Sequence, residues 1–169
     1  MMAVKNDQTI WGWGWNDHIQ LGGILGSQSK TPSQVPMANE IKVVSTGAFH
    51  TVALKNDGTV WRWGYNDRGQ LGKGTSGTIK FSRDPVRVTG LGNVTGISAG
   101  WQHSLALKAD GTVWSWGRNH FGQIGDGTLE TRTTPVQVTG LDNVSGIAVG
   151  DHYSVAAKED GTVWAWGYN

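Results

Sequence analysis

Histidine residues recur at a fixed place in this sequence, and the imidazole side chain is able to bind metals or transfer protons. His50 and His103 occupy equivalent positions in two repeated segments, and Tyr153 occupies that position in a third. A metal centre needs three or four ligands, and no carboxylate recurs beside these histidines. We therefore interpret His50 and His103 as buried side chains that connect strands through hydrogen bonds, and we expect no metal site.

Three aspartates, Asp57, Asp110 and Asp160, are each followed by glycine. The Asp-x-Asx-x-Asx-Gly spacing of Ca²⁺-binding loops is absent. Asp-Gly is instead a strong signal for a tight β-hairpin, whose type I′ turn requires positive φ at both residues. The predicted turn glycines are Gly58, Gly111 and Gly161. Because no set of acid, base and nucleophile emerges, we expect a protein that is not an enzyme and that has no cofactor.

Composition and charge exclude several classes of function. The chain of 169 residues has a net charge of +1, and only 16% of its residues are charged. Proteins that bind nucleic acid or anionic membranes usually carry clusters of Lys and Arg, which are missing here. Cysteine is absent, so there is no disulfide framework. Residues 1–16 contain no secretory signal, no apolar run approaches the ~18 residues of a membrane span, and no compartment is assigned.

The histidines and aspartates belong to a longer repeated phrase that includes Asp-Gly-Thr-Val-Trp-x-Trp-Gly. The first tryptophan of each copy is Trp11, Trp61, Trp114 or Trp164, and these lie 50, 53 and 50 residues apart. A period near 50 indicates a solenoid, a propeller or an array. We expect one repeat domain over residues 1–169, with units at approximately 1–40, 41–93, 94–143 and 144–169, of which the first and last are partial.

Each complete unit reads as four short strands. In the unit 94–143, alternating apolar and polar residues predict strands at 94–99, 103–108, 112–116 and 135–138. Proline begins the last strand, which suits an outer edge strand because the missing N–H breaks no ladder bond there. No segment shows a helical period. We therefore expect an all-β fold, a β-propeller or a partial propeller arc of four-stranded antiparallel blades, with about three blades per chain.

Two tryptophans alternate along one strand of each unit and therefore point to the same face of its sheet. We expect this bulky face to pack against small residues on the facing side of the neighbouring sheet. Trp114, for example, is expected to fill space between two blades. The tryptophans with this structural role are Trp61, Trp63, Trp114, Trp116, Trp164 and Trp166.

Segments 47–72 and 100–125 share the pattern Gly-x-x-His-Ser/Thr-x-Ala-Leu, followed by Asp-Gly-Thr-Val-Trp-x-Trp-Gly-x-Asn-x-x-Gly-Gln-Leu/Ile-Gly. This pattern resembles the repeats of the regulator of chromosome condensation family. The resemblance implies a seven-bladed propeller, of which three periods form only a part. The chain is then either a fragment of a longer propeller, which we favour because it stops within a motif, or half of a ring that two copies close by self-association.

Loops lie on the two flat faces of a propeller and usually carry binding. The loop 73–84 is three residues longer than its counterparts and combines an aromatic side chain with cations, as protein-binding surfaces often do. Its candidate binding residues are Lys73, Lys80, Phe81 and Arg83. A second candidate surface consists of Trp101, Phe49 and residues 151–152, in the short loops between the first and second strands.

Trp101 belongs to the pentad Gly-Trp-Gln-His-Ser. A photoreceptor within the family that this chain resembles carries Gly-Trp-Arg-His-Thr pentads with stacked Trp and Arg. Here Gln102 replaces the arginine, and Ala48 and Asp151 replace the tryptophan in the other units. The resemblance therefore does not extend to light absorption.

We predict a non-enzymatic β-propeller scaffold that binds a protein partner of unknown identity. The resemblance also implies an alternative, guanine-nucleotide exchange on a small GTPase, which is the activity of the family's namesake. Exchange requires a projecting wedge loop, and the loop 73–84 is enlarged by only three residues. A second alternative is a secreted inhibitor or lectin-like bacterial propeller, because a bacterial β-lactamase inhibitor is similar in fold.

Overall fold

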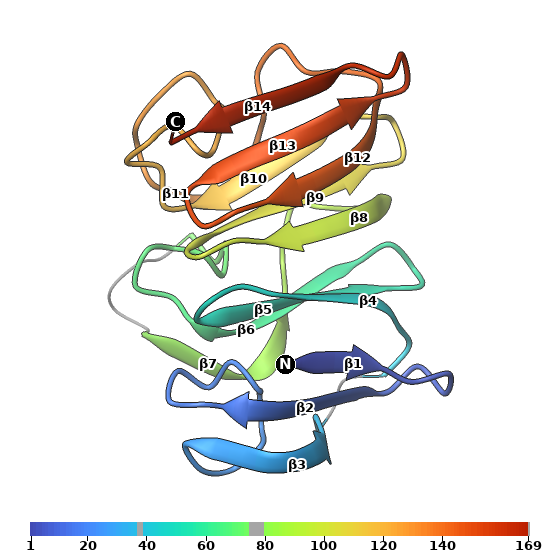
Figure 1. The fold of residues 1–169 in the computed structure, drawn as a ribbon, viewed down its shortest axis with the longest axis vertical. Helices are drawn as coiled ribbons and strands as arrows, with labels where there is room; N and C mark the ends of the chain where they lie inside the picture. Colours follow the sequence, from blue (N-terminus) through green and yellow to red (C-terminus); the bar gives the residue numbers. More distant parts are fainter. Residues whose placement is uncertain (37–38, 75–79, 169) are drawn as a thin grey trace.

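The computed structural model describes residues 1–36, 39–74 and 80–168, and within these ranges the chain forms strands and turns without a helix. The strands form four antiparallel sheets, in which neighbours in sequence are neighbours in space. The sheets follow one another as blades of an arc, from the first at the bottom of Figure 1 to the fourth at the top. The predicted all-β propeller arc is confirmed.

The two inner sheets have four strands each. The second sheet contains β4 (Ile41–Thr46), β5 (His50–Lys55), β6 (Val60–Tyr65) and β7 (Phe81–Arg87). The third sheet contains β8 (Val94–Ala99), β9 (His103–Lys108), β10 (Val113–Gly117) and β11 (Arg132–Gln137).

The two outer sheets have three strands each among the described residues. The first sheet contains β1 (Met2–Val4), β2 (Ile10–Trp15) and β3 (Gln28–Gln34). The fourth sheet contains β12 (Val144–Val149), β13 (Tyr153–Lys158) and β14 (Val163–Gly167). The first sheet thus holds the second to fourth strand positions of a blade, and the fourth sheet holds the first three.

The Asp-Gly hairpins differ from the predicted turn type. In the β9–β10 hairpin, Gly111 has a φ of 75°, whereas Asp110 is not in the left-handed region. The N–H of Gly111 bonds to the carbonyl of Lys108 at 3.0 Å, and the N–H of Lys108 bonds to the carbonyl of Thr112 at 3.0 Å. These bonds enclose a three-residue loop, which is the pattern of a type I turn followed by a glycine bulge. The type I′ prediction is wrong, although glycine is still required.

Prolines lie inside the outer strands and not at their starts. Pro32, Pro85 and Pro135 fall within β3, β7 and β11, each next to a shift in strand register. β7 and β11 are the outermost strands of their sheets, as predicted. A bulge on an edge strand accommodates proline because no ladder bond depends on its missing N–H.

The core lies between sheets, where the tryptophan face of one sheet packs on the preceding sheet. Trp116 packs in one hydrophobic cluster with Val52 and Val60 of the second sheet, and Trp63 packs in another with Ile10 of the first sheet. Both indoles are fully buried. Trp114 was predicted to fill the space between two blades, but it is only partly buried. The space between the second and third sheets is filled mainly by Trp116.

The two faces of a sheet do not divide into a bulky and a small one, contrary to the prediction. Trp116 lies opposite Ser104 in the strand ladder, so the tryptophan face also carries small residues. The other face combines the large Leu105 with the small Ser115. Each face mixes large and small side chains because an indole needs a small cross-strand neighbour to reach the next sheet.

Arg62 is an exception in this core. It stands at the position of Ser115 in the next unit and is 1% exposed. One guanidinium nitrogen donates to the carbonyl of Arg87 at 3.3 Å, while Nε and the other terminal nitrogen find no hydrogen-bond partner among the described residues. Burial lowers the pKa of Arg62 to about 10. The second and third sheets therefore enclose a poorly satisfied charge.

Candidate partner-binding face

Each sheet has two ends with different loops. One end, to the left in Figure 1 where β2 and β14 finish, carries loops 16–27, 47–49, 66–74, 100–102, 118–131 and 150–152, and we call it the loop face. The other end carries the Asp-Gly hairpins, and we call it the hairpin face. The two faces differ strongly in the chemistry they present.

Seven aromatic or imidazole rings form a continuous line across the loop face, from the first sheet to the fourth. Consecutive ring centroids lie between 4.6 and 6.2 Å apart. We call this line the aromatic ridge, and its members in order are Trp15, His18, Phe49, Trp101, His152, Phe121 and Tyr168. Several are well exposed, including Tyr168 at 62% and Trp15 at 51%.

The ridge brings together two surfaces that the sequence predicted separately. Phe81 and Arg83, predicted to lie in the loop 73–84, belong to the start of β7. Tyr65 lies 5.2 Å from His18 and 5.4 Å from Phe81, so Phe81 is connected to the ridge as a side branch. Trp101 of the short loop stands at its centre, 6.2 Å from Phe49 and stacked on His152 at 4.7 Å. Phe81 and Trp101 therefore belong to one connected set of rings.

The predicted basic residues lie beside this set but do not form a cluster. Lys80 and Arg83 are exposed. Arg83 lines a cleft of about 320 Å³ that also contains Asp17 of the first sheet. Lys73 is partly buried, and burial together with the charge of Arg62 lowers its pKa. Residues 75–79 of the predicted loop 73–84 lie outside the described residues.

Charges on the loop face are balanced. By sequence its loops carry the carboxylates Asp17, Asp67, Asp126, Glu130 and Asp151 and the cationic side chains Arg68, Lys73, Lys80 and Arg118. Arg68 pairs with Asp67 at 3.5 Å, and Arg118 donates to the side chain of Gln102 at 3.0 Å while lying over the ring of Phe121. The face therefore offers aromatic surface without a surplus of either charge.

A buried asparagine holds each long loop that supports the ridge. The backbone N–H groups of Leu21, Leu71 and Ile124 donate to the side-chain oxygens of Asn16, Asn66 and Asn119, at 2.8, 3.1 and 2.9 Å, respectively. Such bonds replace the backbone pairing that a loop lacks, so they fix the loop conformation. Sequence reasoning did not assign this role, although the asparagine recurs at the same place in each unit.

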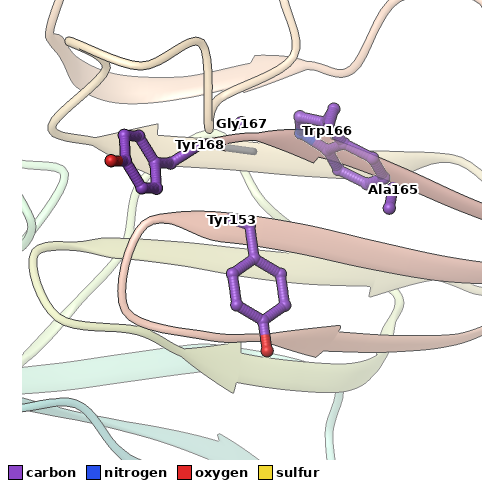
Figure 2. A pocket seen from close by; sticks show the side chains of 5 residues that line it. All are labelled: Tyr153, Ala165, Trp166, Gly167 and Tyr168. Carbon is purple, nitrogen blue, oxygen red and sulfur yellow. The ribbon is translucent and has the colours of Figure 1, made fainter.

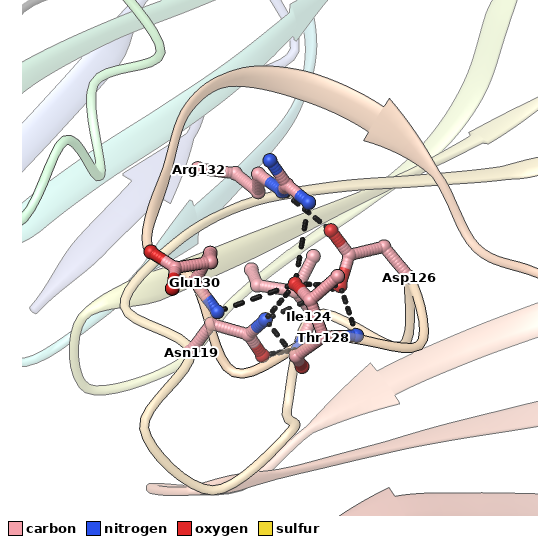
Figure 3. Close-up of polar contacts among 6 residues, drawn as sticks. All are labelled: Asn119, Ile124, Asp126, Thr128, Glu130 and Arg132. Atoms are coloured by element: carbon pink, nitrogen blue, oxygen red, sulfur yellow. Dashed lines mark hydrogen bonds and ion pairs between the residues drawn. The ribbon is translucent and has the colours of Figure 1, made fainter.

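In the third long loop, residues 118–131, a carboxylate adds further hydrogen bonds to those of the buried asparagine (Figure 3). Asp126 accepts hydrogen bonds from the N–H and hydroxyl of Thr128, at 3.0 and 2.8 Å, and from the guanidinium of Arg132. Asn119 donates to the carbonyl of Thr128 at 2.9 Å. Burial raises the pKa of Asp126, but these hydrogen bonds outweigh it and hold the pKa below its usual value. The charge is satisfied inside the loop and serves to shape it.

His50 and His103 lie between sheets and not at the surface. Nε2 of His50 is 2.8 Å from the hydroxyl of Ser104, and Nε2 of His103 is 3.1 Å from the hydroxyl of Ser154. Burial lowers the pKa of His50 to about 3, with a smaller contribution from His103. Burial likewise lowers the pKa of His103 to about 4. Both side chains are therefore neutral connectors between neighbouring sheets.

The glycine three residues before each histidine is a packing requirement. A Cβ on Gly47 would lie 2.7 Å from the imidazole of His50 and 2.2 Å from the carbonyl of Gly100. The same geometry holds at Gly100, whose Cβ would lie 2.6 Å from the imidazole of His103. This contact explains the Gly-x-x-His part of the repeated phrase.

A second inter-sheet contact uses the glutamine of the phrase. The indole N–H groups of Trp63, Trp116 and Trp166 donate to the backbone carbonyls of Gln20, Gln70 and Gln123 in the preceding sheet, at 3.0, 2.8 and 3.0 Å, respectively. The second, third and fourth sheets are thus each hydrogen-bonded to a loop of the preceding sheet. Sequence reasoning assigned the tryptophans to packing but missed these acceptors.

The hairpin face is organised around lysine and not around clusters of rings. Four lysine ammonium groups lie 5.1–5.9 Å from tryptophan ring centroids, in the pairs Lys5–Trp11, Lys55–Trp61, Lys108–Trp114 and Lys158–Trp164. The threonine after each Asp-Gly pair donates its hydroxyl and N–H to the aspartate, which lowers the pKa of Asp57, Asp110 and Asp160. These aspartates stabilise turns.

A cavity of about 500 Å³ lies on the outer face of the fourth sheet (Figure 2). It is lined by Tyr153, Ala165, Trp166, Gly167 and Tyr168. The equivalent face of the third sheet is covered by the fourth sheet, where Ser154 contacts His103. In the described part of the chain, no group of three or more His, Asp or Glu side chains is placed to hold a metal ion. No helix there is long and apolar enough to cross a membrane.

Comparison with curated proteins identifies relatives that are longer than this chain. It is 31% identical to the ultraviolet-B receptor UVR8 of Arabidopsis thaliana over 129 residues, which cover 73% of this chain and 28% of the receptor. It is 34% identical to the E3 ubiquitin-protein ligase HERC2 of Homo sapiens over 120 residues, which cover 67% of this chain and 2% of the ligase.

Solved structures share the fold. The crystal structure of Prp20p from Saccharomyces cerevisiae matches with a TM-score of 0.88 at 24% identity, covering 99% of this chain and 43% of that one. Human WBSCR16 matches with a TM-score of 0.86 at 23% identity, covering 99% and 44%. The chain therefore spans less than half the length of each of these proteins.

Family models match most of the chain. The regulator of chromosome condensation (RCC1) repeat matches residues 7–54, 57–107 and 110–157, and a second model of the same description matches 41–70 and 94–123. The three matches contain both glycine–histidine contacts, the Asp-Gly pairs at 57–58 and 110–111, and the paired tryptophans Trp61/Trp63 and Trp114/Trp116. The chain belongs to the regulator of chromosome condensation (RCC1) repeat family.

Proposed function

We propose that this chain is a non-enzymatic propeller scaffold that binds a protein partner through its loop face. The observation that carries the proposal is the aromatic ridge, a line of rings that crosses all four sheets. Exposed aromatic side chains are enriched at protein–protein interfaces and supply much of their binding energy. On the hairpin face, the tryptophans of the described residues are each paired with a lysine and form no line of ring contacts.

Similar structures support a protein partner. One is the crystal structure of Kap60 bound to yeast RCC1 (Prp20), and another study of Prp20p describes its binding properties to Gsp1p and histones. These partners are those of Prp20p, whose chain is more than twice as long as this one. For this chain they therefore support only the class of function, which is binding to a protein.

The residues with potential for catalysis already have structural roles. His50 and His103 are buried between sheets, and Asp57, Asp110 and Asp160 are bonded to the threonines of their own turns. A catalytic base or acid needs access to a substrate in addition to a suitable pKa. This arrangement supports a binding role over an enzymatic one.

Site-specific photo-crosslinking tests the proposal. A benzophenone amino acid in place of Phe49 on the ridge, and in a second variant in place of the exposed Glu159 in the Asp160-Gly161 hairpin, is irradiated in lysate of the source organism. We expect protein adducts from position 49 and few from position 159. Adducts from position 159 alone, or from neither position, would contradict a partner on the loop face.

Nucleotide exchange is a second candidate function. It is favoured by one feature of the sequence, the longer connection between β6 and β7, after which Phe81 contacts Tyr65 at the start of β7. Release of a labelled guanine nucleotide from a panel of small GTPases tests it. Accelerated release that is lost in Phe81→Ala would favour the exchange function. Unchanged release across the panel would exclude it and leave only the scaffold function.

Ring closure by two copies is a further proposal about partners. It is supported by the exposed outer face of the fourth sheet, where Val163 is 70% exposed and Tyr153 is 47% exposed. Light scattering behind size exclusion tests it. A mass of twice 18.2 kDa would support closure, and a monomer would exclude it.

A further inference from the structure

We propose that the aromatic ridge binds an extended, proline-rich and weakly charged segment of a partner protein, with Trp101 as the central contact. This inference rests on the proposed function and adds the class of ligand. It follows from the shape of the ridge, from the balance of charge around it and from the hydrogen-bond donors that the ridge leaves unused.

The shape of the ridge favours a linear ligand. Its rings follow one another in single file from Trp15 in the first sheet to Tyr168 after the fourth. A small molecule is usually held in a concave pocket that encloses most of its surface. The cavities described above lie away from the middle of the ridge, at the outer face of the fourth sheet and beside Arg83. An extended chain contacts such a line along its length.

The charge of the loop face does not favour strongly charged ligands. Its loops carry five carboxylates against four cations, and Arg83 and Arg132, at the adjoining ends of β7 and β11, bring the cations to six. Nucleic acids need a surplus of cations, and a highly basic peptide needs a surplus of carboxylates. A segment with few charges requires neither surplus. It also loses little hydration free energy when it contacts aromatic rings.

Trp101 has a free donor at the centre of the ridge. Among the described residues, all indole N–H groups except those of Trp13 and Trp101 donate a hydrogen bond within the protein, for example Trp116 to Gln70 and Trp164 to Thr162. Within residues 1–36, 39–74 and 80–168, that of Trp101 donates no hydrogen bond, and it is not fully buried. The hydroxyls of Tyr65 and Tyr168 also bond to no other group in these ranges. Ring faces and unused donors therefore occur side by side.

A polyproline II segment matches this combination. It has no internal hydrogen bonds, so its carbonyls are free to accept from indole and phenol donors. Its proline rings pack on aromatic side chains, and its preformed backbone lowers the entropy cost of binding. Such segments are extended and often uncharged, as the geometry and the charge of the ridge require.

A peptide library tests the inference directly. Twelve-residue peptides in three sets, proline-rich with apolar residues, rich in Lys and Arg, and rich in Asp and Glu, are probed with the fluorescently labelled full chain. We expect binding in the proline-rich set. The affinity of the strongest peptide is then measured in solution by fluorescence anisotropy. Binding confined to a charged set, or to none, would overturn the inference.

Variants assign the contact to Trp101. Trp101→Ala and Phe121→Ala should each weaken the peptide at least tenfold. Trp101→Phe keeps a ring but removes the N–H donor and should weaken it about three- to tenfold, as expected for one hydrogen bond. Trp164→Ala, an exposed tryptophan of the hairpin face whose N–H is bonded to Thr162, is the matched control and should change nothing. Equal losses in Trp101→Ala and Trp164→Ala would refute the ridge as the site.

The two proposals fail in different ways. Protein adducts at position 49 without any peptide binding would leave the scaffold function standing and would exclude a proline-rich ligand. Absence of both adducts and peptide binding would exclude both proposals. Melting curves of each variant, compared with those of the unchanged chain, separate loss of binding from loss of folding.

Discussion

The same repeated phrase forms the core in the middle of the arc and the surface at its end. Val60 and Val163 are equivalent residues of that phrase, yet Val60 is 0% exposed and Val163 is 70% exposed. Likewise His103 is fully buried, whereas Tyr153 at the same position is 47% exposed. The difference arises because the third and fourth sheets cover the faces before them, while nothing among the described residues covers the fourth. The repeated phrase determines that a strand forms and which side chains point to each face. Whether those side chains are buried depends on the adjacent sheet.

The first prediction compares a buried and an exposed tryptophan of the phrase. Trp116→Ala should lower the free energy of unfolding by about 3–5 kcal/mol, because it opens a cavity between the second and third sheets. It also removes the hydrogen bond to the carbonyl of Gln70. Trp164→Ala should cost about 1 kcal/mol or less, since its ring is half-exposed and lies under the ammonium of Lys158. Urea denaturation measures both, and equal losses would contradict the division into core and surface.

The second prediction uses pH to read the buried histidines. His50 and His103 have pKa values of about 3 and about 4, below the ordinary 6.5, so the unfolded chain binds protons that the folded chain does not. Stability is therefore full above pH 6.5 and falls as the pH decreases towards 4. Each histidine should contribute about 1.4 kcal/mol per pH unit in this window.

Two variants separate these histidines from other titrating groups. His103→Gln keeps a donor for Ser154 but does not titrate, so the slope of unfolding free energy against pH should fall by about half. Tyr153→His places a histidine at the exposed position of the fourth sheet and should leave the slope unchanged. A steeper slope in Tyr153→His would show that this face is covered in solution.

The third prediction concerns Arg62, a buried charge between the inner sheets whose Nε and one terminal nitrogen have no partner in the part of the chain that the structure describes. Arg62→Met keeps most of the volume and removes the charge. Replacing poorly paired buried charges by apolar side chains is often stabilising, so we expect a gain of about 1–2 kcal/mol in urea denaturation. Arg62→Ala, which leaves a cavity instead, is the control and should destabilise. A loss of stability in Arg62→Met would indicate that the charge has an ordering role.

The period of the sequence predicted the fold because repetition removes most alternatives. Strands at 94–99 and 103–108 coincide with β8 (Val94–Ala99) and β9 (His103–Lys108). In contrast, the turn type was wrong, since Asp-Gly occurs both in two-residue type I′ turns and in three-residue loops with a glycine bulge. The dipeptide alone does not decide the loop length, which depends on where strand pairing stops.

The ridge was predicted only in pieces, because its members come from non-equivalent positions. Phe49 and His152 share one position of the unit, Trp101 occupies the preceding position, and Trp15 and Tyr168 follow the Trp-x-Trp-Gly strand. A repeat analysis compares equivalent positions and so does not connect them. One signal was present: the residue after Trp-x-Trp-Gly is aromatic in three copies, and in the other it is Arg118, which lies over Phe121.

The last prediction tests the smallest difference between the inner and outer regions, at the hairpin glycines. Gly111 and Gly161 have φ values of 75° and 84°, so alanine at either should cost roughly 1–2 kcal/mol in backbone strain. Only Gly111 has a neighbour: a Cβ there would lie 3.2 Å from the backbone of Asn143, whereas nothing lies within 4 Å at Gly161. Gly111→Ala should therefore cost a few tenths of a kcal/mol more than Gly161→Ala, unless Asn143 moves aside. Equal costs would show that this junction relaxes, so the rigidity of the arc would then rest on the tryptophan and histidine contacts alone.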